Sequence, residues 1–239
     1  MPTLSIIIPT KNEEDYLPNL LKTIRGQSTQ PLEIIVADAG STDTTCLIAE
    51  SFGCKIVDGG LPGPGRNRGA ENASGEYLLF LDADVELQDT EFIASTVNEM
   101  KKRNLDFATC DVLPLSERKI DLWSHEFYNQ YCRLLSKIHP HAPGFCLFAK
   151  REAHQAIHGF DETVLFCEDH DYAVRGAKIG SFGILKSAKI PVSVRRLDRD
   201  GRLGIAVKYA LAEAHIMTLG PIRSDLFNYT FGHTKKRSL

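Results

Sequence analysis

The chain has 239 residues, of which 43% are hydrophobic and 25% charged, the composition of a soluble globular protein long enough for one α/β domain. A net charge of −3 argues against a dedicated nucleic-acid-binding protein, and no apolar run approaches the roughly 20 residues that span a bilayer. The six cysteines show neither a Cys-x-x-Cys pair nor a zinc-type spacing. With no signal peptide in the sequence, they predict a reducing, cytoplasmic location.

The first part of the chain predicts alternating strands and helices. Short apolar runs, typical of strands in a covered sheet, are each followed by residues with helical spacing. Asn12 predicts the start of the first helix and Gly26 its end, whereas the Gly/Pro-rich residues 58–65 predict a loop. Strands are expected at 4–9, 34–37, 55–57 and 77–81, and helices at 12–25, between 43 and 53, and at 67–73. This order implies parallel, right-handed crossovers and a Rossmann-like half.

The second part predicts a further set of elements in the same compact domain, without repeats or a clear linker. Helices are expected at 90–102, 120–135, 151–157, 168–179 and 203–219, and strands at 107–110, 145–148, 182–185 and 190–194. The helix at 120–135 is rich in aromatic residues (Trp123, Phe127, Tyr128 and Tyr131). Their spacing is typical of a face that packs into the core, and we expect them to be buried.

Three polar clusters follow three of the predicted strands, at residues 9–13, 38–43 and 82–84. Because the carboxyl ends of parallel strands meet at one edge of a sheet, we expect the clusters to form one ligand site. Asp82 and Asp84 would point to the same side of an extended chain, and their hard oxygens suit Mg²⁺ or Mn²⁺, which usually hold a substrate's phosphates. Each cluster alone can also be interpreted as turn and helix-capping residues.

Motifs in these clusters resemble those of the family 2 glycosyltransferases, which have the GT-A fold. They are Ile-Ile-Pro-Thr-Lys-Asn-Glu-Glu (7–14), Val-Ala-Asp-Ala-Gly-Ser-Thr-Asp (36–43), Gly-Arg-Asn-Arg-Gly (65–69) and Gly-Glu-Tyr-Leu-Leu-Phe-Leu-Asp-Ala-Asp (75–84). Further on, residues 159–162 resemble the family's Gly-Gly-Phe-Asp-Glu segment, with His158 where a glycine is usual, and residues 166–172 resemble its Glu-Asp motif. The resemblance covers roughly residues 3–185, with the motifs in family order.

The resemblance implies an α/β, Rossmann-like GT-A fold with a central, mostly parallel mixed sheet flanked by helices. It also implies a single domain over residues 1–239, with a nucleotide-sugar-binding half (1–110), an acceptor half (111–195) and a basic C-terminal helix and tail (196–239). The implied donor-binding residues are Pro9, Thr10, Glu13, Asp38, Arg66, Arg68, Asp82 and Ala83.

The implied roles within the donor site differ. Asp38 would accept the N–H of the base, although the family often has a second Asp where this chain has Ala39. Arg66 or Arg68 would reach the base or the diphosphate. Asp84 would bind Mg²⁺ or Mn²⁺, and Asp82 would contact ribose or sugar hydroxyls.

The resemblance implies that Asp169, next to Glu168, is the general base. Displacement at an anomeric carbon needs a carboxylate that takes the acceptor's hydroxyl proton. Crowding among Glu168, Asp169 and Asp171 would raise a carboxyl pKa towards the working pH. These acids can also be interpreted as the first turn of a helix, where they favour the macrodipole.

The sequence therefore predicts a metal-assisted, inverting transferase that moves a sugar from a UDP- or GDP-sugar to a saccharide or lipid-linked acceptor. A sugar-phosphate nucleotidyltransferase is an alternative, but it would need a glycine-rich loop directly after the first strand. A non-catalytic nucleotide-sugar-binding relative is a second alternative, against which Asp84 and Asp169 argue.

Two further features of the sequence remain open. Residues 195–239 carry nine Lys or Arg and four Asp or Glu, a net charge of +5, which predicts either a solvated basic face or peripheral contact with an anionic membrane. Arg195 and Arg196 could clamp a diphosphate or a phosphate-bearing acceptor. A histidine could complete a metal shell, although a lone histidine is more often a surface or packed residue. The candidates are His139, His141, His170 and His215.

Overall fold

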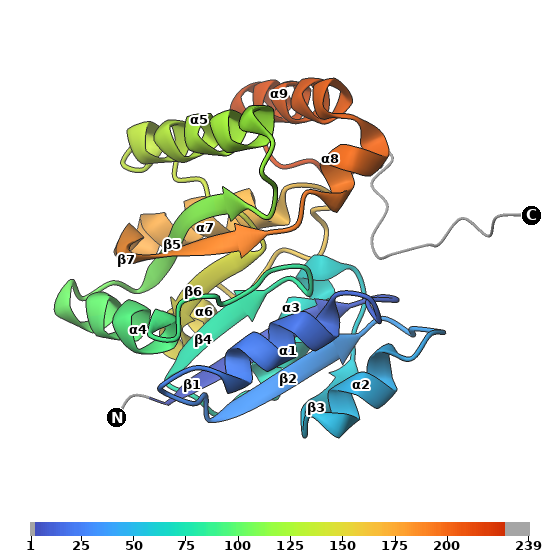
Figure 1. The fold of residues 1–239 in the computed structure, drawn as a ribbon. Helices are drawn as coiled ribbons and strands as arrows, with labels where there is room; N and C mark the ends of the chain where they lie inside the picture. The colour runs from blue at the N-terminus through green and yellow to red at the C-terminus, as the bar shows by residue number, and fades with distance from the viewer. Residues whose placement is uncertain (1–2, 228–239) are drawn as a thin grey trace, which may run out of the picture.

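The computed structural model describes residues 3–227, which form one seven-stranded sheet with helices on both faces (Figure 1). The strand order is β3-β2-β1-β4-β6-β5-β7, and β6 runs antiparallel to its neighbours β4 and β5. The strands are β1 (Leu4–Thr10), β2 (Glu33–Asp38), β3 (Lys55–Asp58), β4 (Tyr77–Leu81), β5 (Phe107–Pro114), β6 (Cys146–Lys150) and β7 (Phe182–Val192). The helices are α1 (Leu17–Arg25), α2 (Thr45–Ser51), α3 (Pro62–Glu71), α4 (Phe92–Lys102), α5 (Lys119–Leu135), α6 (Arg151–Ala156), α7 (Glu168–Ile179), α8 (Arg195–Asp200) and α9 (Arg202–Leu219). The predicted mixed, mostly parallel sheet is confirmed.

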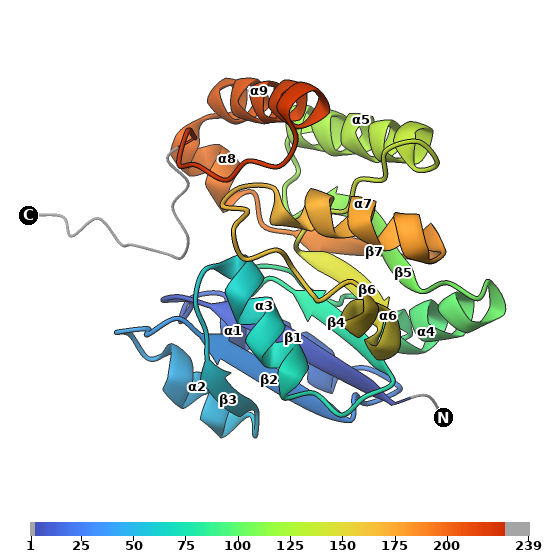
Figure 2. The same cartoon turned by 180° about the vertical axis from the view of Figure 1, so that it is seen from behind.

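The central strands are buried on both faces because each face has its own apolar core. Ile6 and Ile8 of β1 point into a core shared with α1 and α4. Ile7, which alternation sends to the other side, packs with Phe80 and with Tyr172 of α7. Figure 2, seen from behind, shows α3, α6 and α7 over this second face. Continuous apolar runs are therefore the expected sequence of β1 and β4.

Helix α3 contradicts the predicted loop at residues 58–65, since the helix already begins at Pro62. Proline is tolerated in a first helical turn, because the N–H groups of that turn have no partner within the helix. The glycines serve close packing. A Cβ at Gly69 would lie 2.3 Å from Cγ2 of Ile7, and one at Gly65 would lie 3.3 Å from Cβ of Pro9. The helix can therefore lie directly on β1, and this position brings Arg66 to the edge of the sheet.

The predicted start of the first helix at Asn12 is wrong, because α1 begins at Leu17. Asn12 has a left-handed backbone (φ 54°). Its side-chain oxygen accepts the N–H of Thr42 at 2.8 Å, and its own N–H donates to Ser41. The loop after β1 is therefore bound to the loop after β2, so two of the three polar clusters form one structure.

The C-terminal third differs from the prediction in three ways. The two predicted strands at 182–185 and 190–194 form one strand, β7, opposite a register shift between Cys110 and Asp111 of β5. The short helix α8 was not predicted. On α5, Trp123 and Phe127 are 67% and 62% exposed, so the expectation of a buried aromatic face is wrong for these two.

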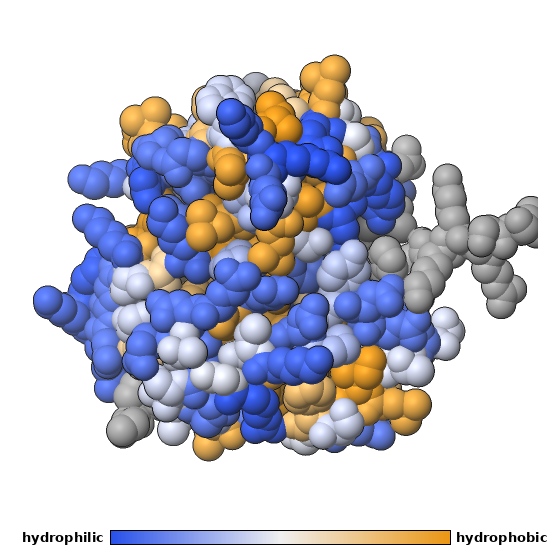
Figure 3. All heavy atoms as spheres, in the orientation of Figure 1, coloured by the Kyte–Doolittle hydropathy of each residue, from blue (hydrophilic) through white to orange (hydrophobic). Residues whose placement is uncertain are grey.

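Helices α5 and α9 lie side by side at one end of the molecule in both views (Figures 1 and 2). They are joined by polar contacts, including the ion pair of Arg202 with buried Asp121. Both helices also expose apolar residues, and Figure 3 shows apolar side chains among polar ones over this end. Among residues 3–227, no helix combines the length and apolarity needed to cross a bilayer.

The described part of the basic C-terminal segment is held to the rest of the molecule by ion pairs. Arg195 pairs with Asp84 and Glu13, Arg202 with Asp121, and Arg223 with Asp161. The solvated basic face, one of the two alternatives from the sequence, is therefore wrong for Arg195 and Arg202, whereas Arg223 remains 53% exposed. The basic residues at 235–237 lie outside the described residues.

Candidate active site

The carboxyl ends of β1, β2 and β4 meet at one edge of the sheet, as expected. Thr10 stands opposite Asp38 in the register of β1 and β2, and Asp82 to Asp84 directly follow β4, the neighbour of β1 on its other side. The strand order changes direction here, since β1 lies between β2 and β4. In open α/β sheets this switch point is where ligands bind.

Asp38 lies at the end of β2 in a set of hydrogen bonds that favour its charged form. Thr10 Oγ1 and Ser41 Oγ donate to Oδ2 at 2.9 and 2.6 Å, and the Ser41 N–H donates to Oδ1 at 2.7 Å. Burial alone would raise the pKa of Asp38, but the bonds from Ser41 and Thr10 lower it overall. The Cys46 thiol is a further hydrogen-bond donor to this carboxylate.

Glu13 and Asp84 are joined by Arg195, which lies 111 residues beyond Asp84 in the chain. The guanidinium donates to both oxygens of Glu13 at 2.7 and 2.9 Å, and its Nε donates to Oδ2 of Asp84 at 2.7 Å. It also lies 4.2 Å from the ring centroid of Tyr16. Burial raises the pKa values of Glu13 and Asp84, and Arg195 opposes this effect in both.

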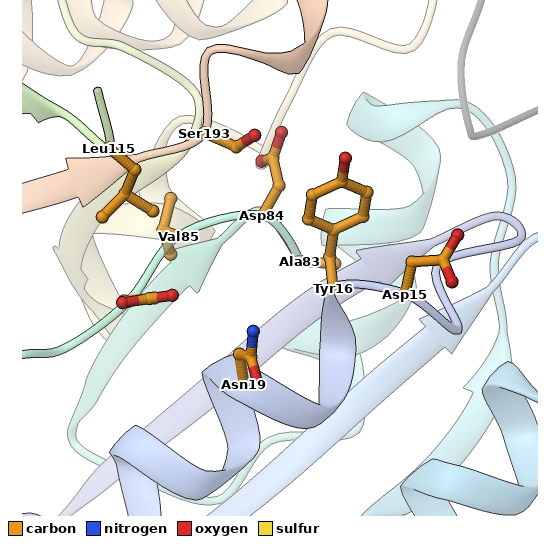
Figure 4. Close-up of a pocket in the computed structure, with 9 residues that line it drawn as sticks. Asp15, Tyr16, Asn19, Ala83, Asp84, Val85, Leu115 and Ser193 are labelled. Carbon is orange, nitrogen blue, oxygen red and sulfur yellow. The ribbon is translucent and has the colours of Figure 1, made fainter. Parts of the chain in front are cut away.

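A pocket of about 130 Å³ lies beside Asp84, between the start of α1 and the end of β7. Figure 4 shows Asp84 and Ser193 together at its upper end and Asn19 of α1 below them. The Ser193 N–H donates to the Asp84 carbonyl at 2.9 Å. Since sites for drug-sized ligands measure roughly 300–1,000 Å³, this pocket is too small for a whole nucleotide sugar.

Arg66 of α3 connects the two halves of the sheet edge. Its side chain is 2% exposed and donates to Oδ1 of Asp82 at 2.8 Å, to Oε1 of Glu168 at 2.6 Å and to the Gly144 carbonyl at 2.9 Å. Arg68, two residues along the helix, is exposed and lies beside Gly60. Of the two arginines considered from the sequence, the structure therefore brings Arg66 into the acidic cluster.

Asp169 lies in the first turn of α7, two residues after a strained residue. Cys167 has a left-handed backbone (φ 58°), which is uncommon for a residue with a side chain. The carboxylate of Asp169 accepts the N–H of Gly144 at 2.6 Å and that of His170 at 2.9 Å. Burial nevertheless raises its pKa, although nearby Arg66 opposes the shift.

The neighbouring acids have different surroundings. Burial also raises the pKa of Glu168, with Arg66 opposing it. Asp171 pairs with Arg175 at 2.7 Å. Of the three acids that crowd this turn, only Asp169 is held by backbone N–H groups without an ion pair of its own among the described residues.

The site as a whole has an excess of acid. It comprises five carboxylates and two guanidinium groups: Glu13, Asp82, Asp84, Glu168, Asp169, Arg66 and Arg195. Within residues 3–227, Oδ2 of Asp82 and Oδ1 of Asp84 accept no hydrogen bond. Oxygen-only ligands of this kind fit Mg²⁺ or Mn²⁺. The sequence did not predict the ion pairs of Arg195 with Glu13 and Asp84. It singled out Arg195 only because this residue follows a predicted strand.

Comparisons with known proteins agree with this geometry. The family model described as glycosyl transferase family 2 matches residues 5–157. An uncharacterized glycosyltransferase of Rickettsia typhi is 29% identical over 196 residues, covering 75% of this chain and 60% of its own length. The GalNAc(5)-diNAcBac-PP-undecaprenol beta-1,3-glucosyltransferase of Campylobacter jejuni is 37% identical over 97 residues, covering 36% of this chain and 31% of its own. This chain thus spans between about a third and three fifths of these two relatives.

A solved structure shows the same fold. The mannosyltransferase PcManGT from Pyrobaculum calidifontis, in complex with GDP-Man and Mn²⁺, superposes with a TM-score of 0.68 at 21% identity. The match covers 89% of this chain and 61% of that one. The likeness therefore concerns the overall fold.

Proposed function

Because the chain belongs to glycosyltransferase family 2, we propose that it transfers a sugar from a nucleotide-diphosphate donor to a hydroxyl acceptor, with inversion at the anomeric carbon. The observation that carries the proposal is the meeting of three groups at one sheet edge. They are an ionised Asp38, the acid pair Asp82 and Asp84, and Asp169 with its raised pKa. The first suits a base N–H, the second a metal-bound diphosphate, and the third an acceptor proton.

In this proposal the donor lies across the ends of β1, β2 and β4. Pro9 and Thr10 line the nucleoside pocket, and Asp38 accepts the N–H of the base. Asp82 and Ala83 contact ribose or sugar hydroxyls, and Arg66 stays behind Asp82 and orients it. Glu13 acts through Arg195, because both of its oxygens are engaged by that guanidinium.

Asp84 would hold the divalent metal ion. Bound Mg²⁺ or Mn²⁺ supplies charge neutralisation for the leaving diphosphate. The protein's own contribution is to bind and orient the donor and, through Asp169, to take the acceptor's hydroxyl proton. Asp169 can do this only when ionised, and the two backbone N–H groups that bind its carboxylate hold it in a fixed position.

The donor and metal assignments predict a specific thermal-shift pattern. With UDP- and GDP-sugars, we expect the matching donor to raise the melting temperature more in the presence of Mn²⁺ than without it, since a ligand of the folded state stabilises it. Asp84→Asn should remove the metal-dependent part of the shift. Glu71→Gln, an exposed change at the end of α3, serves as the control. An unchanged Mn²⁺ effect in Asp84→Asn would refute the metal assignment.

Arg195 predicts a competition with the metal ion. Its guanidinium already neutralises Asp84 and Glu13, so Arg195→Gln should tighten Mn²⁺ binding to the donor-free protein about tenfold, or ~1.4 kcal/mol. Isothermal titration calorimetry measures this affinity directly. Arg199→Gln changes an arginine of the same helix that pairs with its neighbour Asp200, and should have no effect. Weaker Mn²⁺ binding in Arg195→Gln would mean that the arginine supports the metal rather than competing with it.

We further propose that the acceptor is a saccharide or lipid-linked hydroxyl reached from the end formed by α5 and α9, at the cytoplasmic face of a membrane. Support comes from the exposed apolar residues on these helices, next to basic residues that suit anionic lipid. The apolar residues are Ile120, Leu122, Trp123, Phe127, Leu134, Leu203, Val207, Tyr209, Leu211, Met217 and Leu219. The basic residues are Lys119 and Lys208.

Vesicle co-sedimentation tests the membrane contact. The full chain should sediment with vesicles containing anionic phospholipid, and the Trp123→Ser, Phe127→Ser double variant should lose most of this binding. Leu47→Ser is the matched control, because Leu47 is 65% exposed on α2, in the other half of the chain. Equal binding by all three proteins, or none, would exclude this surface as a membrane contact.

A further inference from the structure

A second group of metal-binding side chains lies outside the acidic cluster. His139 and His141 belong to the loop between α5 and β6, and Glu213 lies on α9. Each offers one ligand atom, and these three atoms lie within 4.8 Å of one another. A tetrahedral Zn²⁺ with bonds of about 2.0–2.1 Å separates its ligands by roughly 3.4 Å, so small side-chain movements would bring all three onto one ion.

The hydrogen bonds of His141 point to a ligand at its second nitrogen. Its ring is 1% exposed, and Nδ1 lies 2.7 Å from the carbonyl oxygen of His139, so Nδ1 must carry the proton. The lone pair of a neutral ring is then on Nε2, which lies 2.9 and 3.0 Å from the two oxygens of Glu213. Two acceptors facing each other repel, unless a proton or a metal ion lies between them. A backbone carbonyl on the far nitrogen is the usual support of a metal-bound histidine.

The surrounding histidines favour the metal ion over a simple ion pair. His139 Nδ1 and His170 Nδ1 are buried and have no hydrogen-bond partner within residues 3–227. The rings of both contact that of His141, with centroids 5.1 and 4.7 Å apart. Two imidazole nitrogens without a partner among the described residues therefore lie against the ring of His141, where an ion pair with Glu213 alone would leave them unused.

Tyr131 completes the arrangement from the side of α5. Its hydroxyl donates to Oε1 of Glu213 at 3.0 Å, which orients the carboxylate in the way that outer hydrogen bonds orient metal ligands. The ligand chemistry also differs from that at β4. Two imidazoles and a carboxylate suit Zn²⁺ and related transition metals, whereas Asp82 and Asp84 offer only oxygen, which suits Mg²⁺ or Mn²⁺.

We propose that His139, His141 and Glu213 form a Zn²⁺-class site that ties the loop at 136–145 to α9. The same loop carries Gly144, whose N–H binds Asp169. The site therefore holds in place a loop that contacts the first turn of α7. The proposal is independent of the transfer reaction, because it concerns a different ion and different ligands.

Cobalt and zinc titrations of the chelator-treated full chain test this site. We expect one equivalent of Co²⁺ to bind with the visible absorption of a four-coordinate ion, to be displaced by Zn²⁺ and not by Mg²⁺, and Zn²⁺ to raise the melting temperature. Glu213→Gln and His139→Gln should each weaken Zn²⁺ binding by at least about 100-fold, because the loss of a residue that only orients a metal ligand already costs about 10–100-fold. His215→Gln on the same helix is the control, since His215 lies outside the cluster.

Three results would overturn the proposal. They are no Co²⁺ spectrum with the unmodified chain, a spectrum that survives both ligand substitutions, or equal loss in His215→Gln. His139 is only partly buried, so its variant tests the ligand role without opening the core. With the first of these results, an unchanged melting temperature in Zn²⁺ would show that His141 and Glu213 form an ion pair only.

Discussion

Asp169→Asn should lower kcat by about 10²–10⁴-fold, the usual contribution of a positioned general base. Donor binding should stay within about twofold, because the change lies on the acceptor side of the site. The amide cannot take a proton, and its NH₂ group would face one of the two backbone N–H groups that bind the carboxylate. Release of the nucleoside diphosphate, followed by chromatography, measures kcat, and calorimetry measures donor affinity.

The control for this variant is Asp171→Asn, which removes the same charge from the same helical turn. Asp171 pairs with Arg175, so its loss should affect stability more than kcat. Retained turnover in Asp169→Asn would refute its role as base. The pH profile gives a second check. Because burial raises the pKa of Asp169, the unmodified enzyme should lose activity as the pH falls through a value above the ordinary carboxyl range.

Arg66→Met should lower the free energy of unfolding by about 3–5 kcal/mol, the cost of breaking a buried ion pair from one side. The variant leaves Asp82 and Glu168 without their common partner and opens the bond to the Gly144 carbonyl. Urea unfolding at pH 7 measures the loss. The deficit should shrink as the pH falls and the unpaired carboxyls become protonated, since the neutral forms need no partner.

Arg68→Met is the matched control, because it makes the same exchange at an exposed position of the same helix. Its free energy of unfolding should lie within about 0.5 kcal/mol of the unmodified protein. Adding Glu168→Gln to Arg66→Met should restore part of the loss, because one of the two unpaired charges is then removed. Equal stability of the two arginine variants would show that Arg66 does not hold the two halves together.

Local pattern predicted much of the sheet and the position of the site. The apolar runs of β1, β2 and β4 are local, and so are the acids directly after them, so the meeting of Thr10, Asp38 and Asp82 followed from the parallel order. The start of α1 and the first half of α3 did not follow. Asn12 accepts a hydrogen bond from the loop after β2 and does not begin a helix. Gly65 and Gly69 are needed because α3 packs closely on β1. Both depend on neighbours that local propensity does not include.

The sequence by itself determined the class of fold, the order of strands and helices, and the acids at the sheet edge, because these depend on periodicity and on residues adjacent in the chain. Only the tertiary structure decided which long side chains meet. Arg66 joins Asp82 to Glu168, Arg195 joins Asp84 to Glu13, and His141 meets Glu213 across 72 residues. Such contacts depend on how distant elements pack. A charged residue or a histidine at one position in the sequence does not show which distant residue it will contact.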